Sequence, residues 1–141
     1  MIGGRALILA VAVGALGACA GDLADPERFA DCPPGYVEQM FQESCSGGGD
    51  CHDSSEPEAS LDLVTPGAVS RLMGVASVQE ACEGAPLIDP AGGDHLILQK
   101  LSDGAPCGAR MPFGEAKLSR SDIECVRRWV EAAVAAEGGG S

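Results

Sequence analysis

The residues best suited to chemistry in this chain are two cysteines and a histidine, Cys45, Cys51 and His52, in the segment CSGGGDCH. A cysteine followed by a Cys-His pair is the arrangement by which c-type haem is attached, with the thiols bound to the haem side groups and the histidine held under the iron. The usual spacing leaves two residues between the cysteines, whereas here there are five. Three consecutive glycines, residues 47–49, favour a bulge that absorbs the extra length, because glycine accepts backbone angles closed to other residues.

Two other interpretations of the same segment compete with haem attachment. Cys45 and Cys51 could instead form a disulfide that closes a glycine loop and leaves His52 at the surface. Zinc is disfavoured because the spacings around Cys51 match no common finger and an exported protein oxidises its thiols. Hydrolytic catalysis has less support, since the chain lacks Gly-x-Ser-x-Gly and His-Glu-x-x-His and has only two histidines.

A possible second iron ligand is Met111, in the irregular stretch GARMP of residues 108–112. A haem iron bound by histidine on one side commonly takes a methionine sulfur on the other, which raises its potential. Met111 follows the Cys-His segment and precedes the last helix, in an order that favours this role. His95 is the weaker alternative ligand, and Met40 and Met73 lie at apolar helical positions that predict core packing.

The N-terminal segment predicts export. Residues 6–16 form an apolar run of eleven residues after Arg5, shorter than the roughly 20 residues that span a bilayer as a helix and typical of a signal peptide. Residues 16–19 (LGAC) resemble the lipobox of bacterial lipoproteins, which implies that residues 1–18 are removed and Cys19 is acylated. The alternative is ordinary cleavage nearby, with Cys19 free or paired. We therefore expect a lipoprotein of the cell envelope, anchored in a membrane and facing the periplasm or the cell surface.

Length and charge limit what the rest of the chain can be. The protein has 141 residues, a formal net charge of −12, seven cysteines and five aromatic residues. Such a length indicates one small domain, and such a charge argues against nucleic acid as a partner. We expect an acidic tether at residues 19–34, a domain at 35–137 and a disordered tail at 138–141. A core with so few rings predicts that staples or a bound group complete the fold.

Apolar periodicity predicts an all-α fold with long loops. Helices are expected at residues 36–44, from a Thr65 cap to about residue 73, at 94–101, and from a capping box of Ser121 and Glu124 to near the C-terminus. Residues 46–60 and 102–118 are too rich in glycine, proline and acids for regular structure. The sequence contains no alternation of apolar and polar residues with period two, so no strand is predicted.

With these elements in place, the chain resembles the small cytochrome c-like domains of lipoproteins from myxobacteria and planctomycetes. The resemblance covers about residues 37–136, and it implies an all-α cytochrome c-like fold with haem c on Cys45 and Cys51, His52 as the proximal ligand and Met111 as the distal one. It is carried by Phe41 before Cys45, Cys51-His52, LDL (61–63), RLMGVAS (71–77), LIDP (87–90), LILQKL (96–101), Met111-Pro112, Leu118-Ser119 and Trp129-Val130.

The remaining cysteines predict disulfides. With Cys19 on lipid and two thiols on haem, four cysteines are left, and they allow three pairings. We favour Cys82–Cys107, which would brace the loop carrying Met111, together with Cys32–Cys125, which would tie the start of the domain to the last helix.

These expectations give an exported, lipid-anchored monohaem electron carrier rather than an enzyme. Residues 22–62 hold eleven acids and one arginine, which predicts either simple solubility or a surface that docks a basic redox partner. The alternative from another functional class is a haem-free, disulfide-stapled lipoprotein with a structural or interaction role.

Overall fold

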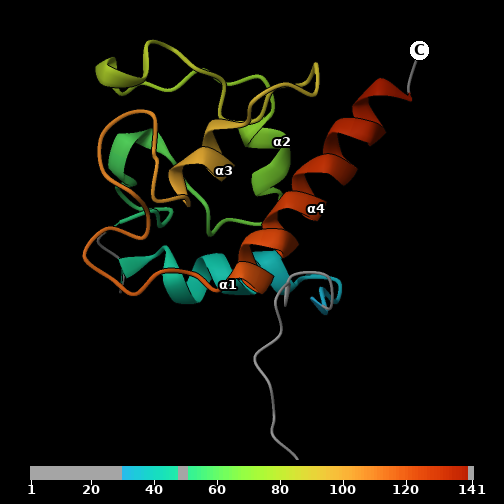
Figure 1. The fold of residues 1–141 in the computed structure, drawn as a ribbon, viewed down its shortest axis with the longest axis horizontal. Helices are drawn as coiled ribbons and strands as arrows, with labels where there is room; N and C mark the ends of the chain where they lie inside the picture. Colours follow the sequence, from blue (N-terminus) through green and yellow to red (C-terminus); the bar gives the residue numbers. More distant parts are fainter. Residues whose placement is uncertain (1–29, 48–50, 140–141) are drawn as a thin grey trace, which may run out of the picture.

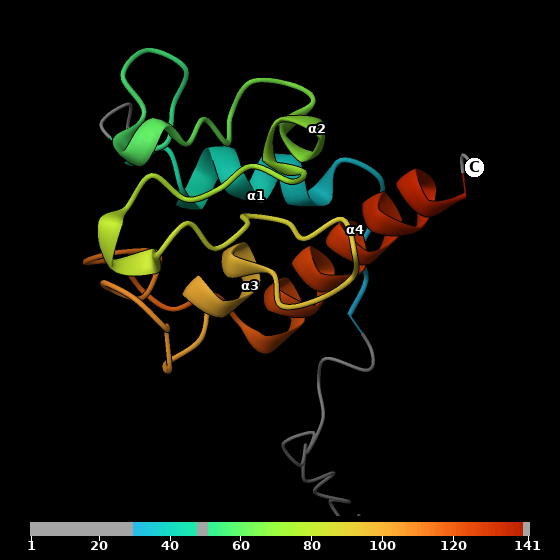
Figure 2. The same ribbon diagram turned by 90° about the horizontal axis from the view of Figure 1, so that it is seen from above.

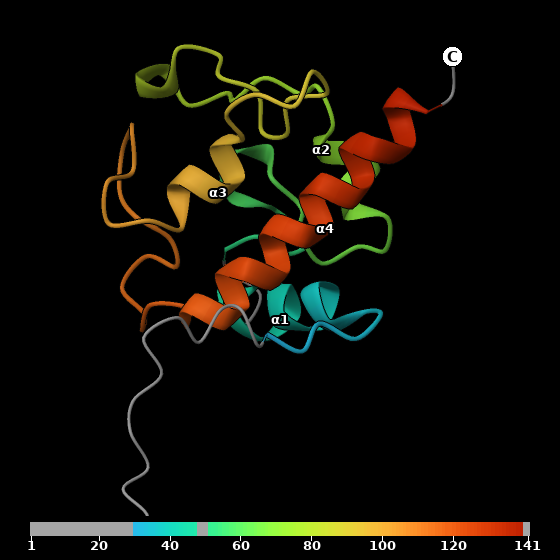
Figure 3. The same ribbon diagram turned by 45° about the vertical axis from the view of Figure 1, so that its right-hand side comes forward.

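The molecule is built on the crossing of its first and last long helices (Figure 1). The computed structural model describes residues 30–47 and 51–139. Its elements are α1 (Tyr36–Ser44), η3 (Glu58–Ser60), α2 (Ala68–Leu72), η4 (Glu80–Cys82), α3 (Leu96–Lys100) and α4 (Arg120–Gly138), where η marks a 3-10 turn. In Figure 3, α4 runs diagonally past α3 and across α1. Within these ranges pairing is limited to two isolated bridges and no strand forms, so the predicted small, mostly α-helical fold is confirmed.

Helix α1 forms over the residues that the sequence predicts. Its buried side chains are Val37, Met40 and Phe41. The Phe41 ring meets Trp129 of α4 edge to face, with centroids 5.5 Å apart and planes at 89°, an arrangement that aromatic pairs favour. Polar bonds flank this contact, because Tyr36 Oη donates to Asp122 Oδ1 at 2.5 Å and Trp129 Nε1 donates to Glu38 Oε1 at 3.0 Å. The crossing is thus fixed by both apolar and polar contacts.

Helix α4 begins earlier than predicted. The capping box uses Ser119 and Asp122, so the expected pair of Ser121 and Glu124 is wrong. The reason is tertiary, since Asp122 at this position also accepts the Tyr36 hydroxyl proton. Burial acts to raise the pKa of Asp122, but the hydrogen bonds from Tyr36 and Ser119 outweigh it and leave that pKa below its usual value.

Helix α2 is shorter than predicted, because Thr65 does not cap it. The helix follows Gly67, whose φ of +84° is in the left-handed region that glycine favours. The Thr65 N–H instead donates to Asp62 Oδ1 at 2.9 Å. Arg71 then binds this loop to α2 by donating to the carbonyls of Asp62, Thr65 and Pro66.

Helix α3 lies inside the predicted range of residues 94–101, with His95 as its N-cap. The described parts of the segments 46–60 and 102–118 are irregular as expected, apart from the short turn η3 in the first. The main core lies between α1 and α4. Its fully buried side chains include Phe41, Leu72, Ile88, Cys125, Val126 and Val130.

Two disulfides staple the domain, and they join the cysteines in the favoured pairing. Cys32 is bonded to Cys125 across 93 residues of sequence, and Cys82 to Cys107 across 25. The first bond holds the end of the predicted tether against α4, where Arg128 Nη1 also donates to the Ala30 carbonyl at 3.3 Å. The predicted signal peptide, Cys19 and the tether up to residue 29 lie outside the described residues.

Removing each disulfide tests its share of the stability. The Cys32→Ala/Cys125→Ala variant should lose about 2–4 kcal/mol of unfolding free energy in denaturant titrations, because the bond closes a very long loop. The Cys82→Ala/Cys107→Ala variant should lose about 1 kcal/mol less, since its loop is shorter. A larger loss for the second variant would contradict this ranking.

Candidate functional site

The segment from Cys45 to His52 follows the end of α1. Its backbone is closed by two hydrogen bonds, since Cys51 N–H donates to the Ser46 carbonyl and His52 N–H donates to the Cys45 carbonyl, each at 3.0 Å. In an α-helix the N–H that bonds to a carbonyl is four residues further on. His52 makes the same bond from seven residues further on. Cys45 and His52 are therefore joined by a backbone bond that the shorter, usual spacing also allows.

This closure depends on Gly47. Its φ is +58°, in the left-handed region, and a Cβ at this position would overlap Cys51 Sγ. Both facts require glycine, because any other residue would meet a backbone penalty and a direct clash. Gly47 thus lets the two cysteines approach each other in spite of their sequence separation.

His52 is buried and held in one orientation. Its Nδ1 lies 3.1 Å from the Leu61 carbonyl, and its own carbonyl accepts the Leu63 N–H at 3.0 Å. A carbonyl only accepts, so Nδ1 carries the proton of the neutral ring and Nε2 keeps its lone pair. An imidazole whose second nitrogen donates to a backbone carbonyl is the usual form of a histidine ligand to a metal.

Cys45 and Cys51 are both free thiols, so the alternative Cys45–Cys51 disulfide is not formed in this structure. Cys45 is half-buried at the end of α1, whereas Cys51 is exposed. Burial raises the pKa of the Cys45 thiol to about 11, and the nearby Cys51 adds to that shift. Cys45 therefore stays protonated at neutral pH, which slows its oxidation.

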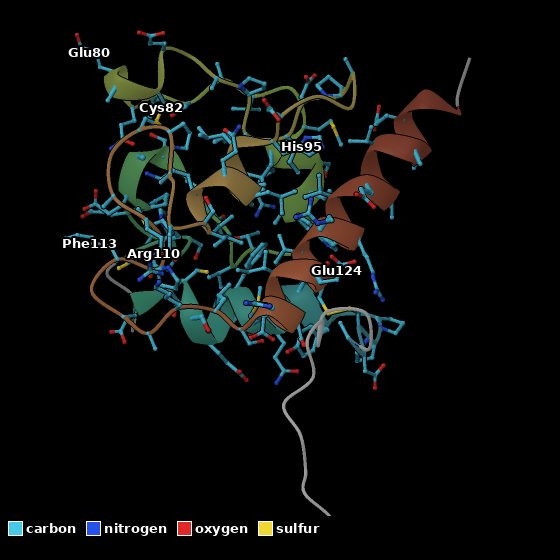
Figure 4. The ribbon with its side chains drawn as sticks, viewed as in Figure 1. Glu80, Cys82, His95, Arg110, Phe113 and Glu124 are labelled. Atoms are coloured by element: carbon cyan, nitrogen blue, oxygen red, sulfur yellow. A yellow bond between two sulfur atoms is a disulfide. The ribbon has the colours of Figure 1, made fainter. Side chains whose placement is uncertain are left out.

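Met111 lies in the loop between α3 and α4, half-buried against the main core. Its N–H donates to the Lys100 carbonyl at 2.7 Å, and its carbonyl accepts from Arg110 Nη1 at 3.0 Å. Figure 4 shows Arg110 beside the exposed Phe113 in this same loop. The loop thus has a defined course although it has no regular structure.

The histidine and methionine segments lie on two sides of the molecule. In Figure 2 residues 51–60 lie along the upper left and the loop of residues 102–118 along the lower left, with η4 between them. The two segments overlap in Figure 1 and are separated along its line of sight.

His95 has a structural role at the start of α3. Its Nδ1 accepts the Asp89 N–H at 3.0 Å, and its carbonyl accepts from Leu98 and Gln99. In Figure 4 it lies beyond α3 from Arg110 and Phe113. The structure therefore does not bring His95 to the loop that carries Met111.

Two surface cavities lie apart from these residues. One of about 280 Å³ is lined by His95, Gln99 and Arg127 among others. The second, of about 450 Å³, lies beside residues 30–38 and the Cys32–Cys125 bond. Within the described ranges, no group of three or more His, Cys, Asp or Glu side chains could hold a metal ion. The structure thus brings Cys45, Cys51 and His52 together through backbone bonds, whereas no hydrogen bond among the described residues joins Met111 to them.

Comparison of the chain with protein-family models, with curated proteins and with solved structures finds no match. In the described ranges, no helix is both long and apolar enough to cross a membrane. The resemblance that the sequence suggests therefore remains an expectation.

Sequence reasoning did not single out the Leu61 carbonyl or Lys100. The Leu61 carbonyl binds His52 and the Lys100 carbonyl binds Met111. Every residue has a backbone carbonyl, so the residue type does not reveal this role. The short motif of residues 61–63 includes Leu61, but it does not indicate that the Leu61 carbonyl binds His52.

The raised pKa of Cys45 predicts slow alkylation. In protein made without a haem-attachment system, Cys45 should react with iodoacetamide about tenfold more slowly at pH 8 than an ordinary thiol, because the loss of thiolate is only partly offset by its greater reactivity. The rate should keep rising with pH until about 11. Mass spectrometry of the labelled peptides would measure it, and a rate that levels off near pH 9 would contradict the raised pKa.

Proposed function

We propose that this protein is an exported, lipid-anchored electron carrier that holds one haem c through Cys45 and Cys51, with His52 and Met111 as the axial ligands. The observation that supports it most is the hydrogen bond from His52 N–H to the Cys45 carbonyl. It joins the two ends of the widened motif by a backbone bond that the usual, shorter spacing also allows, and this supports haem attachment in spite of the extra residues.

The side chains fit a covalently attached haem in two respects. Both thiols are free. Each thiol would add across one vinyl group, so that the S–H bond and the vinyl π bond break, a C–S and a C–H bond form, and no oxidant is needed. His52 is oriented by the Leu61 carbonyl and keeps its Nε2 lone pair available.

In this function the chain would bind the haem, orient it and exclude water from it. Haem iron, when bound, would supply a one-electron couple. His52 and Met111 would be the residues that hold the iron, and the Met111 sulfur would raise its potential. The apolar core beside Met111 and the two disulfides would keep the loops in place around the group.

Anchoring and partner choice complete the proposal. Acylation at Cys19 would hold the domain at a membrane of the cell envelope. The acidic balance of residues 22–62 would favour a redox partner with a basic docking surface. The alternative from another functional class is the haem-free, disulfide-stapled lipoprotein.

The direct test is expression of the full chain with a cytochrome c maturation system. The purified protein should be red, and its Soret absorbance should survive denaturation because the haem is covalent. His52→Gln should abolish normal assembly, whereas the matched His95→Gln variant should leave the spectrum unchanged. A colourless wild type would refute the electron-carrier function and favour the haem-free alternative.

Ligation by Met111 is tested by a matched pair of variants. Met111→Leu should remove the sulfur-to-iron charge-transfer band and lower the reduction potential, because the sulfur ligand raises it. Met73→Leu makes the same change in side-chain volume at another half-buried methionine, next to α2. It should alter neither the charge-transfer band nor the reduction potential. Equal spectra for wild type and Met111→Leu would exclude Met111 as the ligand.

The anchor is tested by Cys19→Ser. This variant should leave the membrane fraction, since it has no site for the acyl chains, and its visible spectrum should not change. Retention of Cys19→Ser in washed membranes would contradict lipid anchoring at this residue.

A further inference from the structure

Lys100, the last residue of α3, makes two contacts with the loop that carries Met111. Its backbone carbonyl accepts the Met111 N–H at 2.7 Å, and its Nζ donates to the Cys107 carbonyl at 2.7 Å. Lys100 thus forms hydrogen bonds with both ends of the segment 107–111.

The side chain of Lys100 is built into the fold. It is half-buried, and desolvation lowers the pKa of its ammonium group. The ion pairs found in the described part of the chain do not include it. Its charge is therefore directed at the Cys107 carbonyl, and hydrogen bonds from a charged donor are stronger than neutral ones.

The chain passes close to this ammonium group. A Cβ at Gly108 would come within 3.3 Å of Lys100 Nζ and 3.0 Å of Gln79 Oε1, and Gly108 has a φ of +58°. Glycine is required here by the close approach and by the left-handed backbone. Residues 107–111 are thus pressed against the end of α3.

The other contacts of residues 107–111 do not join both ends of this segment to one residue. The Cys82–Cys107 disulfide fixes the Cys107 side chain. Arg110 donates to the carbonyls of Met111 and Glu115, which lie within the same loop. Lys100 alone among these links Met111 and Cys107 to a helix of the main core.

We propose that Lys100 is the positioning residue for Met111, and that its ammonium group and carbonyl together hold the loop of residues 107–111 in the course that presents the methionine. The proposal rests on the proposed function in so far as Met111 is an axial ligand. The hold on the loop itself is a property of the chain and is measurable without haem.

Loss of the ammonium group should loosen this loop without unfolding the domain. The Met111 N–H would keep its backbone partner, but the Cys107 carbonyl would lose a charged donor. Amide exchange over residues 107–111 should then be about tenfold faster, as expected for one lost charged hydrogen bond. In the haem-loaded protein the bond from Met111 to iron should weaken, and the reduction potential should fall.

The experiment compares Lys100→Leu, Lys100→Arg and Lys117→Leu in the full chain. Lys117 is a matched control, because it belongs to the same loop but is exposed and paired with Asp103. Hydrogen exchange by mass spectrometry reports the loop, and the charge-transfer band and the potential report ligation. Denaturant titrations check that each variant folds.

The proposal expects faster exchange at 107–111 in Lys100→Leu, with a weaker charge-transfer band and a lower potential, near wild-type behaviour in Lys100→Arg, and no change in Lys117→Leu. Unchanged exchange and ligation in Lys100→Leu would overturn it. A colourless wild type would refute the haem function and the ligand role together, and exchange would still decide whether Lys100 holds the loop. If Lys100→Leu fails to fold, Lys100→Gln takes its place: faster exchange at 107–111 with a weaker charge-transfer band supports the positioning role, and unchanged exchange and ligation reject it.

Discussion

The account depends on one backbone hydrogen bond, from His52 N–H to the Cys45 carbonyl at 3.0 Å. It joins two residues seven apart by a backbone bond, and Gly47 leaves the space that the Cys51 side chain occupies beside it. If that bond were absent, Cys45 would remain at the end of α1 while His52 moved away with the following loop. The orientation of His52 by the Leu61 carbonyl would then be lost as well.

The rest of the structure supplies rigidity that a lean core lacks. α1 and α4 provide the one extensive helix crossing, centred on Phe41 and Trp129. Long irregular segments surround it, and these are held by disulfides and by side chains that bind carbonyls, of which Arg71 and Lys100 are the clearest. Charged donors are effective here because irregular backbone leaves carbonyls without partners from secondary structure.

What could be predicted from the sequence follows from how local each signal is. The bounds of α1 and the inward face of α4 come from apolar spacing, which the fold obeys. The start of α4 was misplaced because Ser119 and Ser121 both suit a cap, and the contact from Tyr36 decides between them. Thr65 does not cap α2 for a similar reason, since its hydroxyl, the group that would cap the helix, binds the Asp62 carboxylate together with its N–H.

The candidate site was predictable in its residue types and not in its closure. Cys45, Cys51 and His52 stand out by chemistry, and the glycines indicate a bulge, but no sequence pattern shows that His52 would bond back to Cys45. The most direct measurement is mass spectrometry of the proteolytic peptide that contains residues 45–52, taken from protein made with a maturation system. The account predicts one haem mass added with both cysteines blocked to alkylation. A peptide two hydrogens lighter, with Cys45 bonded to Cys51 and no added mass, would contradict it.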